Sequence, residues 1–197
     1  MAKVIQFPND STPERFGPQR VRKKRVTDLE KHGQLNLFSG GRVVRLNQLS
    51  TFEEALLLDD QGDFQAARER YSKAIEEGDA LADSYCNLGI LEFQDGNLTK
   101  AIDYFTLSLK NDPRHFEAHY NLANLYGEVG NFSLAKVHYQ VSIEIEPSFP
   151  NSYFNLGLTL AMNKEFKEAI RVLNKYRELT PDSEHRQADE LIQKLGQ

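Results

Sequence analysis

Residues 116–149 read FEAHYNLANLYGEVGNFSLAKVHYQVSIEIEPSF, and this stretch determines the fold that we expect for the chain. Its first half carries apolar residues at helical spacing as far as Gly130-Asn131, and a second helical run follows and ends at Pro147. Glycine just after a helix and asparagine just before the next one are typical C-cap and N-cap residues. The stretch therefore predicts two helices joined by a tight turn.

The same pattern recurs along the chain with a period of 34 residues. Three kinds of position repeat four times each: a small residue in the first helix, an alanine in the second, and a large residue four positions after that alanine. A fixed period of 34 residues with these residue classes resembles the tetratricopeptide repeat. The positions are Ala55, Gly89, Ala123 and Gly157, then Ala67, Ala101, Ala135 and Ala169, then Tyr71, Phe105, Tyr139 and Leu173.

The resemblance implies an all-α fold, a right-handed α-solenoid of four helix hairpins in which neighbouring repeats share a core. A final helix in residues 184–197 has apolar residues on one face, and we expect it to cap the last hairpin. The four repeats span residues 48–81, 82–115, 116–149 and 150–183.

Two repeats depart from the pattern where a helix ends. The first repeat ends in Gly78-Asp79 where the others have proline, and we expect Gly78 to stop its helix in the left-handed conformation. The fourth repeat has Asn163-Lys164 where the others have a glycine turn. We expect Asn163 to take the positive φ that glycine adopts in those turns.

Composition limits the classes of protein to which the chain can belong. Its 197 residues allow one domain with an extension, and the single cysteine, Cys86, indicates a reducing compartment. No run of 18 apolar residues predicts a membrane span, and the start of the chain does not resemble a secretory signal. The sequence therefore predicts a soluble cytoplasmic protein.

Residues 1–47 differ from the repeats in charge and in composition. They carry ten basic and four acidic residues, whereas residues 48–197 carry fourteen and twenty-five. Prolines and polar residues predict that residues 1–33 are disordered. A basic arm on an acidic body indicates two roles, or the docking of one part on the other. The basic cluster is a solvated tail, a contact for nucleic-acid phosphates or another acidic surface, or a nuclear-import signal, and it consists of Arg20, Arg22, Lys23, Lys24 and Arg25.

A short apolar segment, residues 34–46, interrupts this tail. Its first five residues, QLNLF, resemble the motif with which bacterial DNA-repair and replication proteins dock on the sliding clamp. The alternatives are an N-terminal cap packed on the first repeat, which terminal repeats need, and docking of the VVRL stretch on a partner. If the segment docks on the sliding clamp, the docking residues are Gln34, Leu35, Leu37 and Phe38.

The sequence contains no motif that indicates catalysis or a cofactor. It has no glycine-rich phosphate loop and no His-Glu-x-x-His metal helix. His115, His119 and His138 are close in the repeat pattern, but no carboxylate or cysteine completes a metal site at a recognisable spacing. We therefore predict a protein that is not an enzyme and binds no metal or cofactor.

The candidate functional feature is therefore a binding surface. We expect the first helices of the repeats to line a trough, and this trough is the candidate surface. One position there is asparagine in three repeats, just before the leucine of NLG, NLA and NLG. A carboxamide both donates and accepts, so such a ladder can bind the backbone of an extended peptide, as in some members of the family, or can tie neighbouring repeats together. The predicted peptide-binding residues are Asn87, Asn121, Asn155, Tyr120, Asn124, Phe154, Ile90, Phe93 and Leu158.

The sequence thus predicts a protein–protein interaction scaffold that binds an extended segment of a partner. Some members of the family bind the C-terminal carboxylate of a chaperone with basic residues, and the corresponding positions here hold none. The alternative is a regulatory or DNA-associated adaptor, in which the basic tail and the QLNLF segment dock on nucleic-acid machinery.

Overall fold

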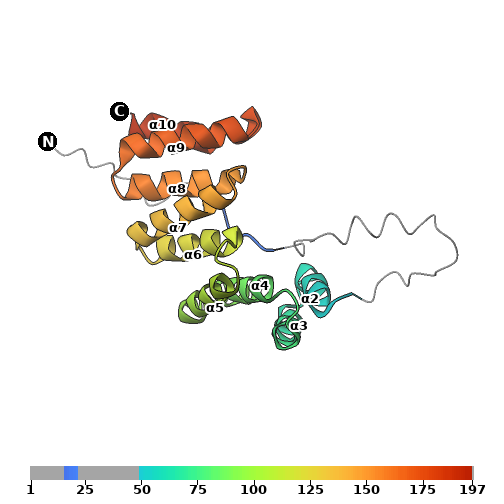
Figure 1. Ribbon diagram of the computed structural model, residues 1–197. Coiled ribbons are helices and arrows are strands. Elements are labelled where there is room, and N and C mark those ends of the chain that lie inside the picture. Colours follow the sequence, from blue (N-terminus) through green and yellow to red (C-terminus); the bar gives the residue numbers. More distant parts are fainter. Residues whose placement is uncertain (1–15, 22–48, 197) are drawn as a thin grey trace. The chain divides into compact units, whose positions relative to one another are not determined.

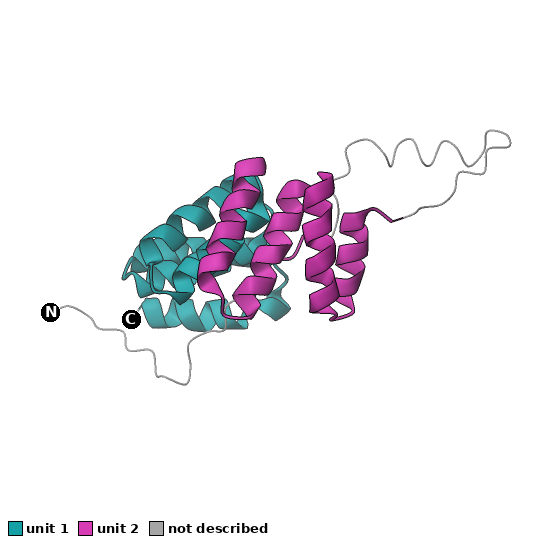
Figure 2. Ribbon diagram, turned by 90° about the horizontal axis from the view of Figure 1, so that it is seen from below, with its two compact units in different colours: residues 1–19, 112–197 teal, residues 20–111 magenta. Residues whose placement is uncertain are grey.

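The computed structural model describes residues 16–21 and 49–196. The chain forms two compact units, drawn in different colours in Figure 2. Of the described residues, unit 1 comprises 16–19 and 112–196, and unit 2 comprises 20–21 and 49–111. Each unit is described separately below.

Unit 2 consists of two helix hairpins. In its described residues α2 packs on α3, α3 on α4, and α4 on α5, so that consecutive helices are neighbours (Figure 1). The helices are α2 (Thr51–Asp60), α3 (Phe64–Glu77), α4 (Leu81–Gln94) and α5 (Leu98–Asn111).

Unit 1 contains two further hairpins and a terminal helix. Here α6 packs on α7, α7 on α8, α8 on α9 and α9 on α10 (Figure 1). The elements are α6 (Phe116–Glu128), α7 (Phe132–Ile145), α8 (Pro150–Met162), α9 (Phe166–Leu179), the 3-10 helix η2 (Asp182–Glu184) and α10 (Arg186–Leu195).

The all-α class and the four predicted hairpins are therefore confirmed, and the hairpins stack in sequence order within each unit, as in a solenoid. The repeated alanines of the second helices and the large residues that follow them are all fully buried. In the second and fourth repeats a side chain at the small-residue position of the first helix would be crowded: a Cβ on Gly89 would lie 2.7 Å from the Phe105 ring, and one on Gly157 2.6 Å from Leu173 Cγ. Small residues at this position thus let each first helix approach its partner.

The turns follow the predicted pattern with one correction. Gly62, Gly96 and Gly130 have φ values of 81°, 77° and 77°. In the fourth repeat Lys164 adopts φ 64°, whereas Asn163 has φ −82°. The expectation for Asn163 was wrong because Lys164, and not Asn163, lies 34 residues after Gly130, and its N–H closes the same turn on Ala161.

The ends of the first and last repeats are as predicted. Gly78 has φ 74° and ends α3 in the left-handed conformation. Helix α10 buries Ala188, Leu191 and Leu195, and it packs on α9. None of the helices in residues 49–196 has both the length and the hydropathy that crossing a membrane would require.

Part of the tail is ordered, contrary to the expectation for residues 1–33. Residues 16–21, FGPQRV, have no regular secondary structure but make hydrogen bonds to side chains of the helices. We call these six residues the N-terminal segment. The predicted role of residues 34–46 lies outside the described residues.

Candidate functional site

The predicted asparagines bind the N-terminal segment, and in unit 1 two of them do so in the same way. Gln19 N–H donates to Asn121 Oδ1 at 2.8 Å, and Asn121 Nδ2 donates to the Gln19 carbonyl at 2.9 Å. Asn155 makes the same two contacts with Phe16. Phe16 N–H donates to Asn155 Oδ1 at 3.2 Å, and Asn155 Nδ2 donates to the Phe16 carbonyl at 3.1 Å. Each carboxamide therefore binds both backbone groups of one residue.

Asn87 on α4 makes the third such contact, within unit 2. Val21 N–H donates to Asn87 Oδ1 at 3.1 Å, and Asn87 Nδ2 donates to the Val21 carbonyl at 3.0 Å. The same Nδ2 lies 3.1 Å from Tyr71 Oη. These contacts involve only the backbone of the segment, so they do not select for particular side chains.

The first repeat lacks an asparagine at this position, and the structure shows what replaces it. The corresponding residue is Glu53, whose carboxylate accepts from Ser50 N–H at 2.7 Å in a capping box at the start of α2. Glu53 therefore stabilises its own helix terminus.

Aromatic residues surround the Phe16 end of the segment in unit 1. The Phe16 ring lies 5.1 Å from the Phe154 ring in an edge-on arrangement and 6.0 Å from the Tyr176 ring. Tyr120 Oη lies 3.0 Å from the Phe16 carbonyl and 3.2 Å from that of Gly17. Burial raises the pKa of Tyr120, so its hydroxyl stays a neutral donor.

Asn124 lies behind the segment. Its Oδ1 accepts from Tyr139 Oη at 2.5 Å and from Asn155 Nδ2 at 2.9 Å. Its Nδ2 is buried without a partner in the described part of the chain. Asn124 thus orients Asn155, whereas the sequence predicted that it would contact the peptide itself.

The other predicted lining residues differ in burial. Leu158 belongs to the hydrophobic cluster of unit 1 against which Phe16 packs, and Ile90 of unit 2 is buried. Phe93 on α4 is partly exposed.

At the other end of the segment, in unit 2, lies an ionic contact for which the sequence predicted no specific pair of residues. The Arg20 guanidinium pairs with the carboxylate of Asp59, which lies at the end of α2 and has only 3% of its side chain exposed. Arg20 Nη2 also donates to Gln94 Oε1 at 3.1 Å, and its Cζ lies 5.4 Å from the centre of the Phe64 ring. Burial raises the pKa of Asp59, while Arg20 and a hydrogen bond from Tyr71 act in the opposite direction.

Only the charge pattern of the sequence indicated this contact. The excess of basic residues in the tail and of acidic residues in the repeats allowed the docking of one on the other. Nothing in the repeat pattern marked Asp59, because it recurs in no other repeat. Of the predicted basic cluster, Arg20 is the only member among the described residues.

The histidines do not form a metal site in the described residues, where no group of three metal-ligating side chains occurs. His119 Nδ1 and His138 Nδ1 lie 3.0 Å apart, so one ring donates to the other. Burial, and then the proximity of His119, lowers the pKa of His138 to about 4. His115 instead caps α6, where its Nδ1 accepts from Ala118 N–H.

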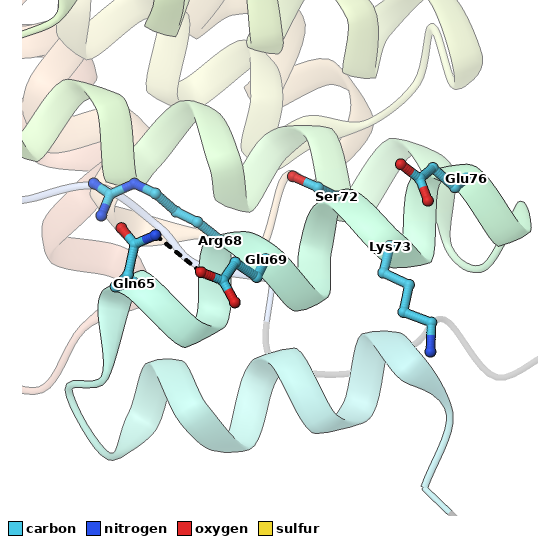
Figure 3. Close-up of a pocket in the computed structure, with 6 residues that line it drawn as sticks. All are labelled: Gln65, Arg68, Glu69, Ser72, Lys73 and Glu76. Carbon is cyan, nitrogen blue, oxygen red and sulfur yellow. Dashed lines mark hydrogen bonds between the residues drawn. The ribbon is translucent and has the colours of Figure 1, made fainter.

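A hollow lies along one side of α3 (Figure 3). Its lining comes from this helix alone and mixes both signs of charge, and Gln65 donates to Glu69 within it. The close-up shows no set of side chains converging on a common point. The residues are Gln65, Arg68, Glu69, Ser72, Lys73 and Glu76.

Two tetratricopeptide-repeat family models match the sequence, one over residues 52–116 and one over residues 104–136 and 138–171. Comparison with curated proteins gave no match. Similar solved structures include the first TPR of Spaghetti (RPAP3) bound to the HSP90 peptide SRMEEVD, at 21% identity and TM-score 0.55 over 58% of this chain and 90% of that one. The TPR2B domain of yeast Sti1 in a pHsp70 complex has 23% identity and TM-score 0.55 over 58% and 95% of the two chains. MamA from Desulfovibrio magneticus RS-1, residue 41 to the end, has 18% identity and TM-score 0.60 over 74% and 91%.

Proposed function

The chain belongs to the tetratricopeptide-repeat family, and on that premise we propose that it is a non-enzymatic scaffold that binds an extended segment of a partner protein. In unit 1, Asn121 and Asn155 would hold the backbone of such a segment, and in unit 2 Asn87 offers the same kind of contact. Two solved structures with this fold, those of RPAP3 and Sti1, are complexes with an HSP90 peptide and with pHsp70. They support peptide binding as the general role.

One observation carries the proposal: three asparagines bind both backbone groups of Val21, Gln19 and Phe16. Every peptide has these backbone groups, so the same carboxamides can hold a segment of another protein. A buried carboxamide without a partner costs free energy, which explains why the chain's own segment lies there.

The charge of the site favours a partner other than an acidic chaperone tail. The buried acid Asp59 would repel a C-terminal carboxylate, and it binds the cation of Arg20 instead. An internal segment with aromatic, aliphatic and basic side chains fits better. The alternative role as a DNA-associated adaptor depends largely on residues outside the described ranges, and it stays a prediction, as does the cytoplasmic location.

The experiment uses the full-length chain with residues 16–21 replaced by glycine and serine, which leaves the asparagines accessible. This variant captures proteins from a lysate of the native host, and the bound segment of each is mapped, synthesised and titrated. Asn121→Ala should weaken its binding about 5- to 150-fold, because the backbone groups of the peptide lose their partner. The matched control is Asn174→Ala, which removes a carboxamide that binds the Ile170 carbonyl within α9.

A specific outcome would contradict the proposal. If Asn121→Ala lowers the melting temperature but leaves the affinity for every captured segment unchanged, the asparagines stabilise the repeats and do not bind partners.

A further inference from the structure

We propose that Asp59, Gln94 and Phe64 of unit 2 form an arginine-binding subsite. A partner peptide would then carry an arginine followed by a small aliphatic residue, as the chain's own Arg20-Val21 does. This inference rests on the proposed function and adds the class of side chain that the site selects.

The subsite binds three features of a guanidinium. Asp59 supplies the opposite charge to Nη1, Gln94 accepts from Nη2 at 3.1 Å, and the Phe64 ring lies 5.4 Å from Cζ. Arginine can make all three contacts at once, because its planar, permanently charged group donates from several nitrogens and stacks on aromatic rings. The single ammonium of lysine cannot reproduce this geometry.

The repeat fold does not itself require an acid at this position. The residues that correspond to Asp59 in the next three repeats are Phe93, Gly127 and Ala161. A buried carboxylate is costly unless it is paired, and burial accordingly raises the pKa of Asp59. Among the described residues, Asp59 accepts a hydrogen bond from Tyr71 Oη at 3.1 Å, and the cation that pairs with it is Arg20 of the segment. The acid is therefore explained by a cationic ligand.

The residue after the arginine is bound by the same network. Tyr71 Oη donates to Asp59 and accepts from Asn87 Nδ2, and Asn87 holds the backbone of Val21. Val21 is only 2% exposed, so its position accepts a small aliphatic group and excludes a charged one. The network thus connects an arginine to the buried residue that follows it.

The chain's own Arg20-Val21 competes with such a partner. A tethered segment has a high effective concentration, so a partner of modest affinity is excluded until the segment is released. Loss of the segment should therefore raise the apparent affinity for the same peptide.

The test uses the full-length chain with residues 16–21 replaced by glycine and serine, and a synthetic peptide of residues 14–23, ERFGPQRVRK, as the probe. We expect this peptide to bind about 10- to 100-fold more tightly than its Arg20→Ala version, with Arg20→Lys in between. Asp59→Asn in the chain should remove the difference between the peptides. Asp60→Asn, which changes the neighbouring exposed acid, should preserve it.

The outcomes separate this inference from the proposed function. Equal affinities for the arginine and alanine peptides would overturn the subsite and leave backbone binding intact, whereas no binding of any peptide by a folded chain would overturn both. If the chain with the glycine–serine replacement does not unfold cooperatively, the subsite is tested instead by amide exchange of Val21 in chains that keep residues 16–21. Asp59→Asn should then accelerate that exchange at least about 10-fold over Asp60→Asn, and equal rates would overturn the subsite.

Discussion

The two ends of the N-terminal segment are bound by the same backbone contacts but by different side-chain chemistry. In unit 1, Phe16 packs its ring on Phe154 and Tyr176, and in unit 2, Arg20 pairs with Asp59. The residues that bind the backbone recur with the repeat period, whereas those that select side chains do not. A periodic fold therefore gives general affinity for a peptide, and its departures from the period give specificity.

A second pair of positions distinguishes the two units. Unit 2 has Tyr85 and Tyr104, with ring centres 6.3 Å apart, where unit 1 has His119 and His138, with ring centres 5.2 Å apart. Of these four residues, only the histidines can gain a proton between pH 7 and pH 4. The two units should therefore respond differently to acid.

The largest expected effect is this acid response of unit 1. The pKa values of both histidines are lowered in the folded chain, that of His138 to about 4, with burial as the main cause. The stability that they contribute is complete above the unfolded pKa of about 6.5 and is lost as pH falls toward 4. The shift of His138 alone corresponds to a loss of about 2–3 kcal/mol. Thermal unfolding at pH 7 and pH 4 measures the loss.

The control for this prediction replaces both histidines by the tyrosines of unit 2. The His119→Tyr/His138→Tyr chain should lose less stability than the parent over the same pH interval. Identical losses in the two chains would show that the acid response arises elsewhere.

The next effect tests whether the hairpins of the two units pack alike. A Cβ at Gly157 would meet Leu173, and one at Gly89 would meet the Phe105 ring. Gly157→Ala and Gly89→Ala should each lower the free energy of unfolding by about 1–3 kcal/mol through overpacking. Urea denaturation checks both, and stability equal to the parent would contradict the tight helix contact.

A smaller effect separates the two ends of the segment. Phe16→Ala removes the ring that packs on Phe154 and should weaken docking of this end by about 1–2 kcal/mol. Exchange of the Gln19 amide, which Asn121 binds, should accelerate about 5- to 30-fold and that of Val21 less. Equal acceleration at both amides would show that the segment is released as a single piece.

The smallest effect concerns the turns. Lys164 adopts φ 64°, where Gly130 has φ 77° in the preceding repeat. Because a side chain is strained in this conformation, Lys164→Gly should stabilise unit 1 by about 0.5–1 kcal/mol. A fall in melting temperature would show that the lysine makes compensating contacts.

The sequence predicted the periodic features of the molecule well. Helix hairpins and buried small residues follow from constraints that act in every repeat, so a single chain shows them several times over. The asparagines at positions 87, 121 and 155 were found in the same way.

Features that occur once could not be predicted in this way. Asp59 has no counterpart in the other repeats, and residues 16–21 lie in a tail whose composition resembles a disordered chain. Their order arises from contacts across the sequence, such as that of Phe16 with Asn155, which no local pattern encodes.

Amide hydrogen exchange at Gln19 and Val21 of the full-length chain tests the central claim most directly, because Asn121 and Asn87 bind these two amides. We predict that both exchange at least about 10-fold more slowly than an unprotected amide. Asn121→Ala should remove the protection of Gln19 first, and Asn87→Ala that of Val21. Unprotected exchange at both positions in the parent chain would contradict the claim that the asparagines bind a peptide backbone.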